Sequence, residues 1–296
     1  MLTDRNGVPF PPVRRLGPDD LRHCGALARD RGWSPEKAKW ALMLEVSDVF
    51  GVDAPDGGLA GAVVLTRYGP RLASVGMMLV AARHSRRGLG RALMEHLLAE
   101  AGDVTVTLVA TDLGKPLYDK LGFRTIRRNA VFVGAFRPAT VKTAATATRD
   151  NSKRRTRPAN AAGDVAAILD IDKAAFGADR SHLLTRLPTF AAELRVLETS
   201  GRVSGFAAAW RNDTVTVIGP VVAPDGAAAR LLITDLAAPV RGPVRLDLDP
   251  RRAELPEWAV RHGLELVAVG AVMAYGAQDP PGDPSRLFAP VSVALA

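Results

Sequence analysis

A basic, glycine-containing turn is the part of the sequence whose residue types best suit chemistry. It lies within Met78–Met94, which reads MLVAARHSRRGLGRALM and passes from hydrophobic to basic to amphipathic. The turn carries four arginines and two glycines, namely Arg83, Arg86, Arg87, Arg91, Gly88 and Gly90. Glycines let a ligand approach the backbone closely, and the free N–H groups at a helix N-terminus suit a phosphate. The turn therefore predicts an anion site, to which the arginines add charge-assisted hydrogen bonds.

Several other kinds of site have little support in the sequence. The turn matches neither GxxxxGK[ST] nor GxGxxG, which argues against a nucleoside triphosphatase and a dinucleotide site. The five histidines have no metal-ligand spacing and Cys24 has no second cysteine, so we expect no metal. Asp247 and Asp249 resemble a DxD pair, but we interpret them as a strand end before Pro250.

A second motif reads TDLGKPLYDKLGF from Thr111 to Phe123. Together, the two segments resemble the acetyl-CoA-binding core of the GNAT superfamily of N-acetyltransferases. In that family the fourth strand hydrogen-bonds the pantetheine and a (Q/R)xxGx(G/A) loop holds the pyrophosphate. The tyrosine of a YxxLGF-like segment protonates the leaving thiolate. The resemblance covers residues 13–136 and implies that Tyr118 is the general acid.

The resemblance also implies which residues contact acetyl-CoA, the acyl donor. They are Met78, Leu79, Val80, Ser85, Arg86, Arg87, Gly88, Leu89, Gly90, Arg91 and Thr111. Ser85 stands where the family usually has Gln or Arg, so one phosphate-binding side chain is missing and the neighbouring arginines would compensate. Thr111 stands where many members have an asparagine that bonds the cofactor's amide, and its hydroxyl would do part of that work.

The two halves of the chain are similar to each other. Three glycines recur 141 to 144 residues later, with Gly61, Gly76 and Gly122 matched by Gly205, Gly219 and Gly263. Segments RGWSP at 31–35, GADR at 177–180 and VMAYG at 272–276 further resemble bacterial proteins built from two GNAT units. The fold class implied is α/β, with tandem GNAT-like folds that are each a twisted mixed sheet flanked by helices.

A segment between the halves predicts a linker. Residues 138–163 are rich in Ala, Thr and basic side chains and contain no aromatic residue, so they bury too little apolar surface to offset their ordering entropy. We divide the chain into a catalytic domain (1–137), a linker (138–156) and a degenerate GNAT-like domain (157–296). The basic cluster Lys153, Arg154, Arg155 and Arg157 is interpreted as a solvated tether, because no aromatic residue stands among the charges to stack on bases.

The second unit lacks both chemical motifs. Its turn reads APDGAAA at 223–229 and contains no cation, and Ala259 stands where the first unit has Tyr118. We therefore predict that the first unit is catalytic and that the second is structural and covers the acceptor cleft.

Hydrophobic periodicity predicts the elements that position the first unit's motifs. Helices are expected over Asp19–Asp30, from Pro35 onward, and over Leu89–Ala101 and Lys115–Leu121. Strands are expected over Leu59–Arg67, Leu72–Val80 and Val104–Ala110. The basic turn thus joins a strand to a helix.

Acetyl transfer to an amine also requires a proton acceptor. An alkylammonium with a pKa of about 10.4 is neutral in only about one molecule in 2,500 at pH 7, a deficit of about 4.6 kcal/mol. Glu36, Glu45 and Asp48 lie in the segment that lines acceptor sites in this superfamily, although each also suits a helix face or a cap. Asp112 is a fourth candidate that also suits a helix cap. The sequence leaves this choice open.

Composition limits the partners. The 296 residues contain 39 Lys and Arg against 31 Asp and Glu, a net charge of +8, which favours an anionic partner. We predict a cytoplasmic N-acetyltransferase that transfers an acetyl group directly, in a ternary complex, from acetyl-CoA to a primary amine of a small molecule or peptide. The alternatives are a non-catalytic acyl-CoA-binding or regulatory module and, ranked last, a nucleic-acid-binding protein. No apolar run is long enough for a membrane span, no secretory h-region is visible, and a homodimer remains open.

Overall fold

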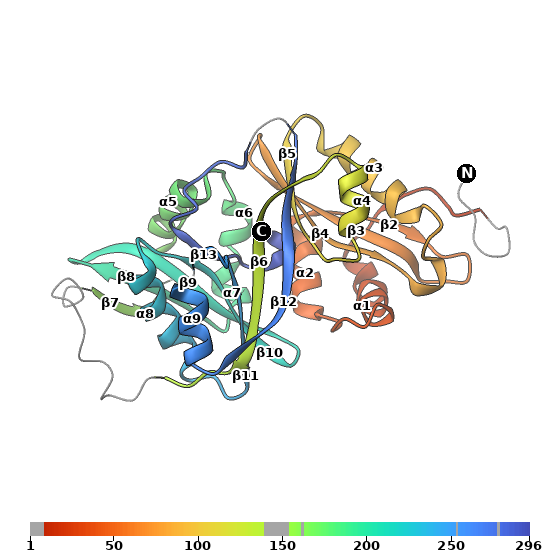
Figure 1. The fold of residues 1–296 in the computed structure, drawn as a ribbon. Helices are drawn as coiled ribbons and strands as arrows, with labels where there is room; N and C mark the ends of the chain where they lie inside the picture. The colour runs from red at the N-terminus through yellow and green to blue at the C-terminus, as the bar shows by residue number, and fades with distance from the viewer. Residues whose placement is uncertain (1–8, 139–153, 161–162, 253, 277–278) are drawn as a thin grey trace.

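The computed structural model describes residues 9–138, 154–160, 163–252, 254–276 and 279–296. In this part of the chain the strands form one mixed sheet that runs through two units, which we define as the described residues before 139 and after 153. Figure 1 shows the two units side by side, the first in red to yellow and the second in green to blue. Among the described helices, none has the length and apolar character that a membrane span requires.

The first unit alternates between strands and the helices that cover them. Its helices are α1 (Leu21–Asp30), α2 (Lys37–Val46), α3 (Leu89–Ala101) and α4 (Lys115–Lys120). Its strands are β1 (Arg14–Arg15), β2 (Asp48–Asp53), β3 (Leu59–Tyr68), β4 (Leu72–Val80), β5 (Thr105–Ala110) and β6 (Arg124–Ala135). Apolar residues at helical spacing along α3, such as Leu89, Leu93 and Leu97, are buried against the sheet.

The second unit repeats this sequence of elements and adds a short strand at its end. Its helices are α5 (Val165–Phe176), α6 (Ser181–Leu184), α7 (Leu187–Phe190), α8 (Gly226–Ala237) and α9 (Glu254–Arg261), with a 3-10 turn, η5 (Val293–Leu295). Its strands are β7 (Arg154–Pro158), β8 (Glu193–Thr199), β9 (Arg202–Asn212), β10 (Val215–Val222), β11 (Pro243–Leu248), β12 (Leu264–Tyr275) and β13 (Leu287–Ala289).

The two units exchange their long strands at the centre of the sheet. Strand β12 of the second unit pairs with β5 and β6 of the first, and β6 in turn pairs with β11. The order is β1-β2-β3-β4-β5-β12-β6-β11-β10-β9-β8-β7, with β13 paired to β10. Figure 1 shows β6 and β12 next to each other between the units. Each unit's sheet is therefore completed by a strand of the other.

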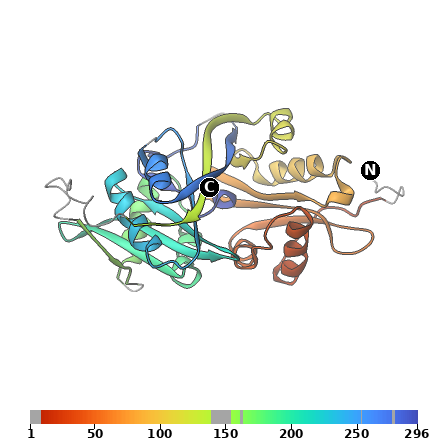
Figure 2. The same ribbon diagram turned by 60° about the horizontal axis from the view of Figure 1, so that its bottom comes forward.

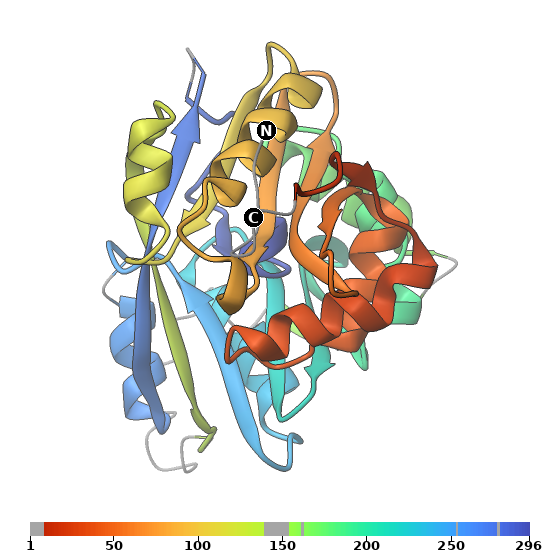
Figure 3. The same cartoon turned by 90° about the vertical axis from the view of Figure 1, so that its right-hand side faces the viewer.

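Helices cover both faces of this sheet. Helices α3, α4, α8 and α9 pack on one face, whereas α1, α2 and α5–α7 pack on the other. Figure 3 shows the red and green helices on one side of the strands and α4 and α9 on the other, and Figure 2 shows the central strands between the two units. Along β6, Ala130 and Phe132 enter the core beneath α8 and α9, so Asn129 and Val131 point to the opposite face, which we call the α1–α2 face.

Several predicted elements are confirmed with small shifts. Strand β4 and helix α3 have the predicted bounds. The helix expected from Pro35 begins at Lys37, because Glu36 adopts a left-handed conformation with φ 46°. The helix expected from Asp19 begins at Leu21, since Pro18–Asp20 forms a 3-10 turn.

The end of the predicted linker is wrong by a few residues. Residues 154–156, assigned to the linker, belong to β7, and most of the predicted linker lies outside the described residues. The arginines of the predicted tether do not hang free, because Arg154 pairs with Asp225 and Arg155, although its side chain is 75 % exposed, pairs with Glu198. Lys153 of the same cluster lies outside the described residues. Arg157 also pairs, with Glu198 and Asp164. Ion pairs thus hold β7 against its neighbours where apolar side chains are lacking.

The close contact of β6 with β12 can be tested at Gly134. A Cβ added there would lie 2.3 Å from the carbonyl oxygen of Gly263 and 2.9 Å from Leu264 Cα, both rigid backbone atoms. We expect Gly134→Ala to lower the free energy of unfolding by about 2 kcal/mol or more, because the two strands must separate. Thermal and denaturant unfolding measure this. Gly17→Ala is the control, since nothing lies within 4 Å of its added Cβ; equal stability of the two variants would contradict the pairing.

Candidate functional site

Strands β4 and β5 pair at one end and separate at the other. They are joined in parallel from Leu72–Val75 to Thr105–Leu108, and in the described residues no strand pairs with Gly76–Val80 on that side. Strand β4 also contains a bulge, because the pairing with β3 shifts register and Met77 has a φ of 47°. A non-glycine residue in this conformation is strained, and such strain often marks a site of function. The split leaves backbone N–H and C=O groups of β4 open to a ligand.

The basic turn lies at the end of this split. Helix α3 begins after Gly88, whose φ of 78° favours glycine, and Arg86 also has a positive φ of 62°. Within the described chain, the N–H groups of Gly88, Leu89 and Gly90 donate to no protein acceptor. They are the orphan donors of a helix N-terminus and suit an anion.

The cations of the turn have different roles. Arg83 pairs with Asp56 at 2.9 Å and Arg91 pairs with Glu95 at 2.7 Å. Arg86 is exposed and has no partner among the described residues. Arg86 is thus the arginine that is most available to a phosphate.

The side chains of four other residues of the predicted donor site already make contacts within the protein. The Ser85 hydroxyl donates to the carbonyl of Ala81, and the Thr111 hydroxyl accepts from the N–H of Gly114. Leu79 is buried toward α1 and α2, and Leu89 is buried in the core below α3. Leu79 and Leu89 can therefore contact a ligand in the split only through their backbone.

Three segments that are distant in the sequence meet at Gly90. A Cβ added to Gly90 would lie 3.3 Å from Met78 Cε and 3.6 Å from both Val80 Cγ2 and Leu117 Cδ2. Strand β4, the start of α3 and helix α4 therefore border one space. The structure brings the predicted pantetheine strand, the predicted pyrophosphate turn and the helix of Tyr118 together.

Tyr118 follows Leu117 on α4 and belongs to the same apolar cluster as Met78 and Val80. Its side chain is 7 % exposed, its ring makes an edge contact with Phe123, and its hydroxyl has no hydrogen-bond partner among the described residues. Burial raises the pKa of Tyr118 to about 12. The phenol is therefore neutral at pH 7 and available as a hydrogen-bond donor.

The acidic residues considered as bases are engaged in other contacts. Glu36 is buried, pairs with Lys39, and accepts a hydrogen bond of 2.7 Å from Asn212 Nδ2 of the second unit. Burial also lowers the pKa of Lys39. Glu45 pairs with Arg186.

Asp48 forms ion pairs with Arg15 and Arg67, so its carboxylate is also engaged in other contacts. Asp112 is exposed, and the cap suggested for it at Gly114 is made by the Thr111 hydroxyl instead.

The corresponding split of the second unit is closed. Strand β10 pairs with β11 through Thr216 and Val217, a shorter parallel pairing than the four pairs of the first unit. Farther along, β13 pairs with β10 at Val221 and Val222 and lies where the split would open. The backbone groups that are open on β4 are thus covered by β13 on β10.

The helix N-terminus of the second unit is also occupied. Asp225 is the N-cap of α8, and its carboxylate accepts a hydrogen bond of 2.9 Å from the N–H of Ala228. The same carboxylate pairs with Arg154. Because a carboxylate already satisfies this helix end, the end cannot also take a phosphate.

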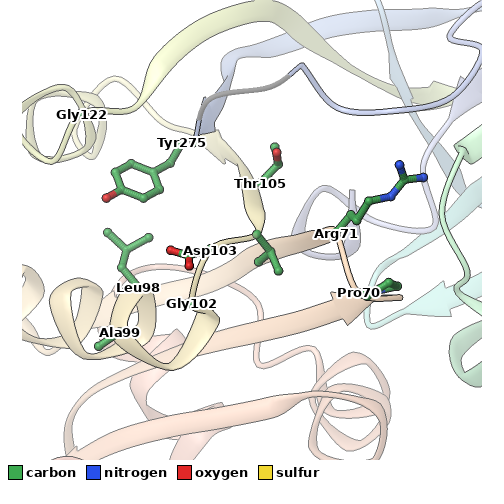
Figure 4. A pocket seen from close by; sticks show the side chains of 11 residues that line it. Pro70, Arg71, Leu98, Ala99, Gly102, Asp103, Thr105, Gly122 and Tyr275 are labelled. Carbon is green, nitrogen blue, oxygen red and sulfur yellow. The ribbon is translucent and has the colours of Figure 1, made fainter.

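A large cavity lies at the opposite end of β5. It has a volume of about 870 Å³ and is lined by residues that include Leu98, Asp103 and Tyr275. Figure 4 shows the Tyr275 ring extending toward Leu98, with Asp103 nearby. None of the predicted site residues lines it. It lies near the start of β5, whereas ligands of parallel strands bind at their carboxyl ends.

A smaller cavity of about 80 Å³ contains polar residues that sequence reasoning missed as a site. Arg127 and Asn129 of β6 line it together with Asp247 and Asp249, the DxD pair at the end of β11. The alternation of side chains along β6 indicates only that Arg127 and Asn129 share one face of the sheet. It does not indicate which residues of other strands lie beside them. Among the described residues, no group of three or more His, Cys, Asp or Glu side chains is arranged to hold a metal ion.

Comparison with known proteins identifies the family. Residues 47–125 match one family described as an acetyltransferase (GNAT) domain, and residues 168–289 match a second family with the same description. The chain belongs to the GNAT acetyltransferases. It is an acyltransferase with two GNAT domains in tandem, in a family that generally uses acetyl-CoA.

The similar proteins extend over nearly the whole chain. An uncharacterized N-acetyltransferase, YitH, of Bacillus subtilis is 29 % identical over 282 residues, which cover 93 % of each chain. A putative acetyltransferase from Pyrococcus horikoshii has a TM-score of 0.78 at 20 % identity, covering 96 % of this chain and 95 % of that one. A tandem GNAT protein from the clavulanic acid biosynthesis pathway has a TM-score of 0.61 at 15 % identity, covering 90 % of this chain and 99 % of that one. These solved structures share the tandem fold.

The role of the basic turn can be tested by coenzyme A binding. We expect Arg86→Ala to weaken coenzyme A binding about 5- to 20-fold, since one charge-assisted contact to a phosphate is lost. Isothermal titration calorimetry measures the dissociation constant. Arg83→Ala is the matched control, because that arginine is already paired with Asp56. Equal affinities of wild type and Arg86→Ala would remove Arg86 from the site.

Proposed function

We propose that the first unit transfers an acetyl group directly from acetyl-CoA to the primary amine of a small molecule or peptide, in a ternary complex. The observation that carries this proposal is the difference between the two splits. The first has an open β4 edge, an unpaired Arg86 and free N–H groups at α3. The second is covered by β13 and capped by Asp225.

The donor would lie with its diphosphate at the basic turn and its pantetheine along β4. Arg86 and the N–H groups at the start of α3 would bind the diphosphate. The open backbone groups of Gly76–Val80 would hydrogen-bond the pantetheine amides, as an additional strand would. The thioester would then reach the part of the split that Tyr118 borders.

The acceptor must lose a proton before its nitrogen can attack. The neutral amine attacks the thioester carbonyl carbon, a C–N bond forms, and the C–S bond breaks. Backbone N–H groups at the β4 bulge, near Leu79, would stabilise the negative charge that develops on the carbonyl oxygen. The low population of neutral amine at pH 7 means that the site must either desolvate the ammonium or take up its proton.

Tyr118 would serve the leaving sulfur. A thiol has a pKa of about 8.5, so full transfer of a proton from a phenol with a pKa of about 12 is unfavourable by about 5 kcal/mol. The proton must therefore move as the C–S bond breaks, and the hydrogen bond from Tyr118 to sulfur contributes most when negative charge has developed there. Burial keeps the phenol protonated throughout the physiological range.

This role predicts the kinetics of one variant. We expect Tyr118→Phe to lower kcat at least tenfold and to leave the affinity for acetyl-CoA largely unchanged, because only the hydroxyl is removed. A panel of amines assayed by thiol release, together with calorimetry for cofactor binding, measures both. The single cysteine, Cys24, is buried and has a pKa raised to about 12 by burial, so the folded protein adds little thiol signal.

Tyr275→Phe is the control for this variant, since Tyr275 lies at the far end of β12 against Phe123. An unchanged kcat in Tyr118→Phe would exclude Tyr118 as the acid. Coenzyme A binding without transfer to any amine would favour the non-catalytic acyl-CoA-binding module instead.

A further inference from the structure

The cavity of about 80 Å³ lies between the two units on the α1–α2 face of the central strands. One end is bordered by Val109 of β5, the first residue beyond the last pair that joins β5 to β4. The cavity then extends across Val272 of β12 to Arg127 and Asn129 of β6 and to Asp247 of β11. It thus begins beside the open split and leads into the second unit.

Two donors in this cavity lack a partner. Asn129 is 7 % exposed, and its Nδ2 is buried without a hydrogen bond. Arg127 has no hydrogen bond or ion pair among the described residues, and burial lowers its pKa. An unsatisfied buried donor is costly, so the buried Asn129 Nδ2, two residues from the half-buried Arg127 guanidinium on the same strand, suits an anionic ligand. A carboxylate would accept from both.

The carboxylate of Asp247 lies in the same cavity as these donors. Asp247 is 3 % exposed, and one of its oxygens accepts a hydrogen bond of 3.0 Å from Arg245 Nε. Asp247 is opposite Val131 on β6, so it is diagonal to Asn129 and within about 7–8 Å of it between Cα atoms. Burial raises the pKa of Asp247, although Arg245 and the Lys39 ammonium act to lower it. A ligand ammonium at its second oxygen would add to these cations.

Two other charged groups that line the cavity, Arg180 and Asp249, are already paired. Arg180 forms a buried, two-point ion pair with Asp172, and its guanidinium lies over the Phe176 ring. Asp249 is hydrogen-bonded by Arg251, which holds the pKa of that carboxyl below its usual value even though burial acts to raise it. Arg128 also lines the cavity but is exposed. The inner groups that a ligand would meet are Arg127, Asn129 and the second oxygen of Asp247.

We propose that this cavity binds the acceptor, and that the acceptor is an amino acid whose side chain carries the reacting amine. The proposal rests on the proposed transferase function. The cavity has room for about five water-sized groups, enough for an ammonium and a carboxylate on one carbon atom. The carboxylate contacts Arg127 and Asn129, and the α-ammonium contacts Asp247.

The spacing of the strands explains why the reacting amine is separate from this head group. Strand β6 is two strands away from β5 and strand β11, which carries Asp247, is three strands away, which corresponds to about 10 and about 14 Å. An α-amine held at Asp247 is therefore too far from the split to react, whereas an amine at the end of an extended side chain that points along the cavity lies closer to Val109. The reaction then forms an amide at the side-chain nitrogen and releases coenzyme A as the thiol.

Three probes separate the contributions. Lysine carries both head groups, 6-aminohexanoate lacks the α-ammonium, and 1,5-diaminopentane lacks the carboxylate. We expect the wild-type kcat/KM for lysine to exceed that for 1,5-diaminopentane at least tenfold. In Arg127→Met the value for lysine falls at least tenfold, and that for 1,5-diaminopentane stays within twofold, because only the carboxylate contact is lost. Asn129→Leu gives a smaller loss of the same kind.

Asp247→Asn tests the ammonium contact. It reduces kcat/KM for lysine but not for 6-aminohexanoate, provided that its thermal unfolding shows an intact fold. Arg261→Met is the matched control, since Arg261 lies on α9 at the other face of the sheet. Calorimetric titration of lysine into the wild type and into Arg127→Met gives a readout that does not depend on turnover, and we expect affinity to fall at least tenfold.

The outcomes distinguish this inference from the proposed function. If amines are acetylated with no preference for lysine, or with a preference that Arg127→Met retains, the inference is overturned and the transferase function stands. A wild type that neither binds nor acetylates lysine also overturns it. Failure of the protein to bind coenzyme A is the separate result that overturns the proposed function.

Discussion

The pairing of β6 with β12 is the contact on which the rest of the structure depends. Strand β12 of the second unit lies between β5 and β6 of the first, and β6 lies between β12 and β11 of the second. Without this pairing, β12 and β6 would each present an open edge at the centre of the molecule. The second unit is therefore required for the first to complete its sheet, even though it lacks the turn and the tyrosine. Its retention has a structural reason that does not depend on catalysis.

The two splits show how one fold supports two outcomes. Both units pair their fourth and fifth main strands over a few residues and then let them separate. In the second unit β13 covers the open edge and Asp225 satisfies the helix end, so the same backbone geometry becomes part of the core. In the first unit the backbone groups of β4 and the N–H groups at the start of α3 have no such partner, so a ligand can bind them. The split is open in one unit and closed in the other because of these local contacts, and not because the order of the strands differs.

The sequence predicted what depends on local pattern. The helical spacing of Leu89–Ala101 and the composition of Leu72–Val80 fix those elements, and the positions of Gly88 and Tyr118 indicate the site. The exchange of β6 and β12 leaves no local trace, because alternation records which face a side chain occupies and not which strand lies beside it. Strand β7 was missed because ion pairs rather than apolar residues hold it. Asp247 does lie near a strand end, but its burial depends on β6, a strand of the other unit.

A buried charge network lies at the seam near the small cavity, since Lys39 of the network and Asp247 of the cavity interact electrostatically. Glu36 and Lys39 of the first unit are buried next to Asn212 of β9, and the Ser34 hydroxyl and the Glu36 N–H both donate to Asp213 in the following turn. Burying these charges costs free energy that apolar residues would not cost, so the network is weak evidence for stability. It does impose a single arrangement of α2 on β9, because a shift would leave buried charges unpaired. The proposed site, with its acyl donor in one unit and its acceptor contacts from both, would need that fixed arrangement, since a displacement of about 1 Å between reacting groups is enough to slow a transfer greatly.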